Sequence, residues 1–190
     1  MKQTVQVSDV RALRALAHPL RNRLLGLLRL EGSSTATLLG ARVGESSGSS
    51  SYHLRQLAAY GFVEEVQGRG AGRWWQARHR QSSWTAAGLQ GQPDGQEVAA
   101  EALRLIVGVQ GRLLQAWSDQ RSALGAEWEE AASVNDYALR LRPDQAQALQ
   151  QELFAVLDRW AHEHPTDVPA EGSLAVSVLL DVLPLEHWTT

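Results

Sequence analysis

The chain contains no cysteine among its 190 residues. Disulfide bonds, cysteine-based metal sites and thiol nucleophiles are therefore excluded. The sequence also lacks an uninterrupted apolar run near the roughly 18–20 residues that a membrane-spanning helix needs. Its first ten residues, MKQTVQVSDV, have no apolar signal-peptide core. We therefore expect a cytoplasmic protein with no membrane partner.

Catalytic patterns are missing as well. No Ser–His–Asp arrangement, carboxylate pair or phosphate-binding loop stands out, so we expect no catalytic residues and no cofactor. His162 and His164 lie beside Pro165 at the expected end of a helix, where such side chains cap carbonyl groups or are solvated. No set of three or four metal ligands is visible, so we expect no metal site and no enzyme.

Charge is divided unevenly along the chain, although the net charge is only −3. Residues 1–80 contain 12 Lys and Arg against 5 Asp and Glu, whereas residues 81–190 contain 6 against 16. A basic half could bind a polyanion, and an acidic half is better suited to self-association or to a small ligand. The alternative is chance clustering of charges on solvated faces.

The first 80 residues show the spacing of four helices followed by two strands. Apolar periodicity predicts helices over residues 8–17, 19–32, 33–44 and 46–61. We expect the first to be capped by Ser8 and the third by Ser33 or Ser34, with Leu38 and Leu39 facing inward. FVEEVQ (62–67) and RWWQAR (73–78) read as strands joined by the hairpin loop GRGAG (68–72). In the second strand, Trp74 and Trp75 should point to opposite faces.

The second half predicts a different unit. Residues 81–96 are polar and contain Gly and Pro, which is typical of a linker. A long helix over residues 97–120 should be frayed or broken near Gly108 and Gly111. A strand over 136–142, a helix over 143–164 and a strand over 173–185 then complete a strand–helix–strand unit. The expected fold class is mainly α with a small β component (α+β).

Two segments carry a family resemblance. LAHPLRNRLLGLL (16–28) and TATLLGARVGESSGSSSYHLRQLAAYGFVEEV (35–66) resemble the arsenic-repressor-type (ArsR-like) winged helix-turn-helix transcriptional regulators. The pattern S-x-H-L-x-x-L stands at residues 51–57 and is followed by Gly61-Phe62-Val63. The resemblance covers about residues 8–80. It implies a DNA-binding domain over residues 1–80. After the linker, the sequence pattern and the acidic charge predict an added C-terminal domain over residues 97–190 for dimerisation or effector binding.

The fourth helix is then the expected recognition helix. Its small hydroxyl residues would allow close approach to DNA, and the helix start favours a phosphate. His53 has two interpretations: it reads a base, or it packs beside the inner face. We expect DNA contacts from the following residues: Ser46, Ser47, Gly48, Ser49, Ser51, Tyr52, His53, Arg55, and, on the hairpin, Arg69 and Arg73.

The same stretch departs from the family pattern. Glu45 and Ser50 stand where an apolar residue is usual, and Gly40 is a weak helix former. We therefore expect a loose turn and a serine run that is poorly ordered without DNA.

The function that these patterns favour is sequence-specific transcription regulation by a homodimer on palindromic double-stranded DNA. Its interface would include the first helix and the helix over 97–120. Two alternatives stay open: a repressor gated by a small molecule in the acidic half, and a winged-helix interaction module that does not bind DNA.

Overall fold

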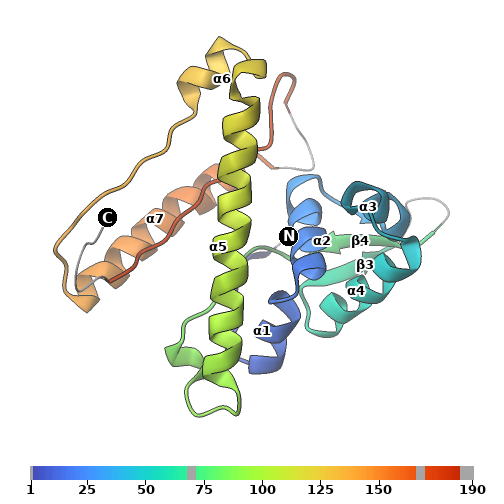
Figure 1. Ribbon diagram of the computed structural model, residues 1–190, viewed down its shortest axis with the longest axis horizontal. Helices are drawn as coiled ribbons and strands as arrows, with labels where there is room; N and C mark the ends of the chain where they lie inside the picture. Colours follow the sequence, from blue (N-terminus) through green and yellow to red (C-terminus); the bar gives the residue numbers. More distant parts are fainter. Residues whose placement is uncertain (1, 68–71, 166–169, 185–190) are drawn as a thin grey trace. The chain divides into compact units, whose positions relative to one another are not determined.

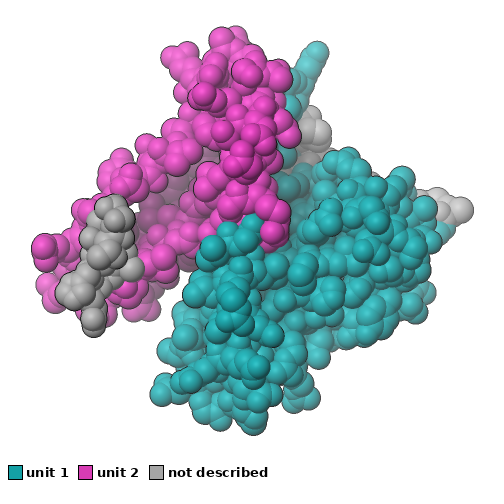
Figure 2. All heavy atoms as spheres, in the orientation of Figure 1, with its two compact units in different colours: residues 1–108, 165–175 teal, residues 109–164, 176–190 magenta. Residues whose placement is uncertain are grey.

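The computed structural model describes residues 2–67, 72–165 and 170–184 and has a mixed α+β fold (Figure 1). This confirms the predicted class. The chain divides into two compact units, which Figure 2 distinguishes by colour. Unit 1 comprises residues 1–108 and 165–175, and unit 2 comprises residues 109–164 and 176–190.

Unit 1 contains four helices close to those predicted: α1 (Val10–Leu16), α2 (Pro19–Leu30), α3 (Ala36–Val43) and α4 (Ser47–Ala59). Pro19 occupies the first turn of α2, where its missing N–H costs no helical hydrogen bond. The predicted cap of α1 was wrong by one residue. Asp9, not Ser8, caps α1, because its carboxylate accepts from the backbone N–H groups of Arg11 and Ala12.

The start of α3 also differs from the prediction. Thr35 caps it by accepting from the N–H of Leu38, whereas Ser34 is already paired in the short strand β2 (Ser34–Thr35). Leu39 is buried, but Leu38 is 55% exposed, so only one of the two leucines faces inward. Gly44 ends α3 in the left-handed conformation (φ 75°), which glycine adopts without a steric penalty.

A three-stranded sheet follows the helices, in the order β2-β4-β3. β3 (Val63–Val66) and β4 (Trp74–Ala77) form the predicted antiparallel pair, with Val63 opposite Ala77. Trp75 is buried and Trp74 is half-buried, consistent with neighbours on opposite faces of the strand. Residues 68–71 of the connecting loop lie outside the described residues.

The predicted linker over residues 81–96 was wrong. β5 (His79–Ser83) pairs in parallel with β1 (Lys2–Gln6), and η1 (Ala87–Leu89) follows with Leu89 buried. The side chain of Gln92 accepts from Val10 N and donates to Ser8 O. Polar composition suggested a linker because the partner of this strand lies almost eighty residues upstream and leaves no local signal.

The buried core lies wholly in unit 1. Every buried hydrophobic residue among those described falls between Val7 and Ala102, and the last two, Val98 and Ala102, belong to α5 (Gly95–Gln120). The predicted break in this helix was also wrong, because α5 continues through Gly108 and Gly111. A helical glycine costs only about 1 kcal/mol, which the neighbouring turns can offset.

Unit 2 contains the remainder of α5, η2 (Arg121–Ala123), α6 (Ala126–Ala131) and α7 (Pro143–Glu163). α7 matches the prediction, but the strands predicted at 136–142 and 173–185 are absent from the described residues 136–142 and 173–184. An alternating pattern alone does not make a strand, which needs a hydrogen-bonded neighbour. The predicted strand–helix–strand unit is therefore corrected to one helix flanked by irregular segments. None of the described residues of unit 2 is buried.

Candidate nucleic-acid interface

The serine-rich stretch forms the beginning of α4. Ser46 has extended backbone angles, and its hydroxyl accepts from the N–H of Ser49 at 3.1 Å, which caps the helix. Ser46, Ser47 and Gly48 are exposed. This end of α4 therefore presents small polar side chains and unpaired helix N–H groups on the surface of unit 1.

The unusual residues of this turn fit one another, which argues against a loose turn; poor ordering of the serine run without DNA stays a prediction. Ser50 is fully buried against α3, and a Cβ added at Gly40 would lie 2.7 Å from the carbonyl oxygen of Glu45 and 2.9 Å from Ser50 Oγ. Gly40 therefore permits a close approach of α3 and α4 that a larger residue would prevent. The Ser50 hydroxyl has no hydrogen-bond partner among the described residues, so its role here is its small size.

One face of α4 continues the exposed surface away from its capped end. Gly48, Tyr52 and Arg55 follow helical spacing, and all three are exposed. Arg55 donates to the carbonyl of Ser51 on its own helix at 3.3 Å and forms no ion pair with any described residue. Ser49 and Ser51 are half-buried at its edge. We call Ser46, Ser47, Gly48, Ser49, Ser51, Tyr52 and Arg55 the α4 surface.

His53 is half-buried beside this surface. Its ring packs against His18 (centroids 4.6 Å apart) and meets Tyr52 edge to face at 5.1 Å. Burial and the nearby Arg21 guanidinium lower the pKa of both histidines, which favours neutral rings. The arrangement favours the packing interpretation of His53 over base reading. The sequence held no sign of the contact, because His18 belongs to the turn before α2.

The hairpin arginines are less available than their sequence suggests. Arg73 pairs with Glu65 at 3.0 Å, and its guanidinium lies 6.0 Å from the centroid of the Trp75 ring. Arg78 pairs with Glu64 at 3.4 Å. Arg69 falls outside the described residues. The carboxylates of Glu64 and Glu65 thus offset part of the positive charge of the hairpin.

Several other arginines of the basic half serve the fold. Arg29 donates to His79 O at 3.0 Å and to Ser82 Oγ at 2.7 Å, and burial lowers the pKa of its guanidinium to about 10. Arg21 donates to the carbonyls of Ala15 and Arg14, where it caps the end of α1. Arg11 and Arg23, by contrast, are exposed and form no ion pair within the described part of the chain.

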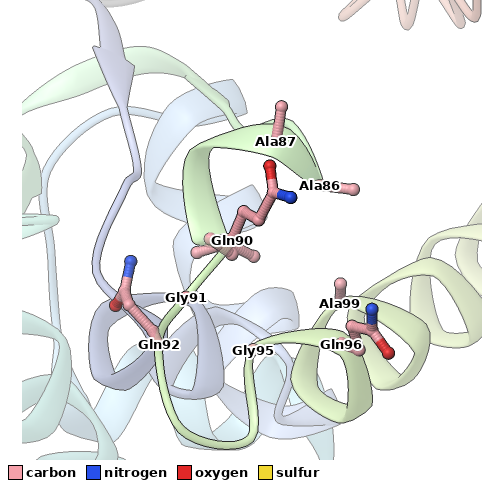
Figure 3. A pocket seen from close by; sticks show the side chains of 9 residues that line it. Ala86, Ala87, Gln90, Gly91, Gln92, Gly95, Gln96 and Ala99 are labelled. Carbon is pink, nitrogen blue, oxygen red and sulfur yellow. The ribbon is translucent and has the colours of Figure 1, made fainter.

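An open hollow of about 420 Å³ lies elsewhere in unit 1, between η1 and the start of α5 (Figure 3). Its lining is neutral and consists of Ala86, Ala87, Leu89, Gln90, Gly91, Gln92, Gly95, Gln96 and Ala99. The neighbouring Asp94 has φ 60° and pairs with Arg14 at 3.2 Å. Its lining residues belong to unit 1, but they fall within the acidic half of the sequence, residues 81–190, in which the small-molecule alternative places an effector.

Within residues 2–67, 72–165 and 170–184, no three side chains of His, Asp or Glu are grouped so that they could hold a metal ion. The helices of these same ranges are too short or too polar to cross a membrane. No protein-family model matches this chain, and no curated protein is similar enough to count as a match.

Proposed function

We propose that this protein is a sequence-specific DNA-binding transcriptional regulator that acts in the cytoplasm as a homodimer on a palindromic site. The observation that carries the proposal is the α4 surface. It combines a capped helix start made of small hydroxyl residues with an exposed Tyr52 and Arg55, on a helix packed closely against α3.

The surrounding elements support this proposal. A helix, a tight turn and a second helix followed by an antiparallel hairpin are the parts of a winged helix-turn-helix, in which the second helix enters the major groove. In unit 1 these parts are α3, the turn at residues 44–46, α4, and β3 with β4. Of the two segments that resemble the ArsR-like pattern, residues 35–66 cover α3, the turn, α4 and β3, whereas residues 16–28 lie at the end of α1 and in α2.

The chemistry of the α4 surface suits a DNA duplex. The serine hydroxyls can donate to or accept from base edges, and the helix N–H groups favour a phosphate. Arg55 can bond to the O6 and N7 of guanine or to a phosphate, because none of the described carboxylates pairs with it. Arg73 would have to exchange Glu65 for a phosphate, so the exposed Arg11 and Arg23, which form no ion pair within the described residues, are better candidates for backbone contacts. Arg69 stays a predicted contact.

Dimerisation follows from the small size of one recognition helix. A single α4 surface offers few base contacts, and two-fold pairing doubles them on half-sites about 34 Å apart or a multiple of that distance. The negatively charged second half would be repelled by DNA, which makes it the better region for self-association.

Selection of bound duplexes from random DNA, followed by titration at several salt concentrations, tests the proposal. We expect a palindromic consensus and a steep decrease of log K with log salt concentration. Arg55→Ala should weaken binding to that site by about 1–3 kcal/mol, and Arg69→Ala should make the salt dependence shallower. Ser49→Ala should change the preferred sequence more than the salt dependence.

Arg42→Ala is the matched control, because Arg42 lies on α3 and pairs with Glu31 at 2.6 Å. This variant should bind DNA almost as the parent does. If no duplex binds more tightly than about 1 µM at low salt, a range that even nonspecific binders approach, the DNA-binding proposal fails. The interaction-module alternative then takes its place, whereas release of bound DNA by a small metabolite would favour the gated repressor.

A further inference from the structure

The segment DYALRLR, residues 136–142 of unit 2, has the pattern of a strand but pairs with no strand among the described residues. It enters α7 as an irregular run in Figure 1. Tyr137, Leu139 and Leu141 alternate with polar or small residues and are 86%, 61% and 42% exposed. Such a segment offers a row of backbone N–H and C=O groups together with one apolar face, which is the template for pairing with another strand.

The segment is complementary to itself when two copies run antiparallel about Leu139. In that register Tyr137 lies opposite Leu141 of the second copy, and Leu139 lies opposite its own equivalent. Aromatic–aliphatic pairs of this kind stabilise antiparallel sheets. Asp136 lies opposite Arg142, so opposite charges meet at both ends of the pairing.

A hydrogen bond at the start of α7 determines which backbone groups of the segment are free to pair with a second copy. The N–H of Arg142 donates to Gln145 Oε1 at 3.0 Å and is therefore occupied. Because alternate residues of an antiparallel strand direct their backbone groups toward the partner, those of residues 137, 139 and 141 remain for a second copy. Asp136 and Arg142 then form a pair whose Cα atoms are about 4.5 Å apart, the closer of the two spacings.

We propose that residues 136–142 of two copies pair as antiparallel strands about a two-fold axis at Leu139. This pairing specifies a contact that would hold the proposed homodimer together. It rests on the proposed function only in taking the protein to be a dimer. A second copy is the occupant that the charges favour, because it supplies an arginine for each Asp136 and a second carboxylate for each Arg142, which within its own chain pairs with the exposed Asp144 at 3.2 Å. The contact is isologous, as closed dimers require.

The strand pair is the centre of a larger interface. Seven residues from each copy bury less than the roughly 1,600 Å² of a standard interface. Unit 2 exposes further large apolar side chains that can supply the rest, among them Leu113, Leu114, Val156, Trp160, Val178 and Leu183. Leu113 and Leu114 belong to α5, the long helix that the sequence places in the dimer interface.

The absence of cysteine makes a direct test available. In full-length Leu139→Cys the two new thiols face each other with Cα atoms about 5.5 Å apart, within the range that a disulfide spans. Mild oxidation should convert most of this variant to a covalent dimer, measured by non-reducing electrophoresis. Tyr137→Cys and Leu141→Cys are the matched controls, because each lies about 14 Å from its own equivalent in this register.

Each control should therefore stay uncrosslinked alone, whereas in a mixture of the two the dimers that contain one copy of each variant should crosslink. The proposal is overturned if Leu139→Cys keeps its helical circular dichroism but does not crosslink, or if Tyr137→Cys crosslinks equally well by itself. If Leu139→Cys does not fold, the mixture of Tyr137→Cys and Leu141→Cys tests the proposal by itself. If the segment paired within its own chain instead, that mixture would not crosslink.

Charge exchange gives a second measurement on the same pairing. Asp136→Arg and Arg142→Asp each place like charges opposite each other, so each variant should dimerise at least tenfold more weakly than the parent in sedimentation equilibrium. Mixed together, they should recover the parent affinity, because both contacts become complementary. Equal dimerisation of the parent, both variants and their mixture would contradict the proposal.

The outcomes for pairing and for DNA binding are separable. A crosslinked Leu139→Cys dimer that binds no duplex removes the proposed function and leaves the pairing intact. A protein that binds a palindromic site and still does not crosslink at position 139 removes the pairing alone.

Discussion

Unit 1 and unit 2 both contain amphipathic helices, but only in unit 1 do the apolar faces of the helices pack into a buried core. Unit 1 buries hydrophobic side chains from α1, α2, α3, α4, α5 and the three-stranded sheet in one cluster, and the half-buried Val5 of β1 packs against it. Unit 2 has an apolar stripe on α7 and further apolar residues around it, yet none of its described residues is buried. An amphipathic helix is stabilised mainly by a second layer against its apolar face. Unit 1 has that layer within the chain, and unit 2 must obtain it elsewhere.

The largest expected difference concerns the leucines of the two units. Leu54→Ala in α4 removes a side chain with no exposed surface and should lower the free energy of unfolding by about 2–5 kcal/mol. Leu124→Ala, at a leucine of unit 2 that is 39% exposed, should change it by less than about 0.5 kcal/mol. Urea denaturation followed by circular dichroism measures both. Equal losses would mean that unit 2 has a core comparable to that of unit 1.

Arginines should show the same contrast with a smaller effect. Arg29→Met removes the donor to His79 O and Ser82 Oγ and should destabilise unit 1 by about 1.5–3 kcal/mol. Arg121→Met in unit 2 disrupts only an exposed pair with Glu129 at 3.9 Å and should cost less than about 1 kcal/mol. Thermal unfolding compares the two variants. A cost for Arg121→Met as large as that for Arg29→Met would contradict the comparison.

Two helical glycines should respond in opposite directions. Gly40→Ala forces a Cβ to within 2.7 Å of a backbone oxygen and should destabilise the protein by about 1–3 kcal/mol. Gly111→Ala in α5 meets nothing within 4 Å and should stabilise it by about 0.5–1 kcal/mol. The signs of the two shifts in urea midpoint are the measurement. A stabilising Gly40→Ala would show that α3 and α4 are not held closely.

The smallest effect expected is a pH dependence confined to unit 1. Because the folded pKa values of His18 and His53 lie below their ordinary values, the unfolded chain binds more protons as the pH falls. Stability from the neutral rings is therefore complete above about pH 6.5 and decreases as the pH falls toward the folded pKa values. Glu45 partly opposes the effect at His53.

Urea midpoints measured between pH 7.5 and 5 test this dependence. The double variant His18→Gln, His53→Gln should have a flatter profile than the parent. An unchanged profile would assign the acid sensitivity to other groups.

Local signals explain which parts of the fold could be predicted. Helix ends could be predicted at Pro19, Gly44 and Ser46, because these residues favour such positions. The helix α7 could be predicted from the helical spacing of its apolar residues. The β1–β5 pair could not be predicted, since neither strand is apolar and the two are distant in sequence. The segment 136–142 failed in the opposite way: its alternation is strong, but the described chain provides no neighbouring strand.

In the candidate interface, too, some features follow from local sequence and others depend on tertiary contacts. The exposed positions of Ser47, Tyr52 and Arg55 follow from helical geometry once α4 is placed. Tertiary contacts decide the rest: Ser50 is buried because Gly40 leaves room for it, and Arg73 is held by Glu65 across the hairpin. Which residues of β3 and β4 face each other can be inferred only when the strand register is known.

The parallel pairing of Lys2 with His79 also has a consequence for biosynthesis. A ribosome adding about 5–20 residues per second makes β1 roughly 4–15 s before its partner strand exists. During that interval the nascent chain can form α1 to α4 locally, while the backbone N–H and C=O groups of β1 have no partner strand. Val98 and Ala102, which complete the core, are made later still. Unit 1 should therefore close late during translation, and a chain arrested before residue 79 would be a ready substrate for chaperones.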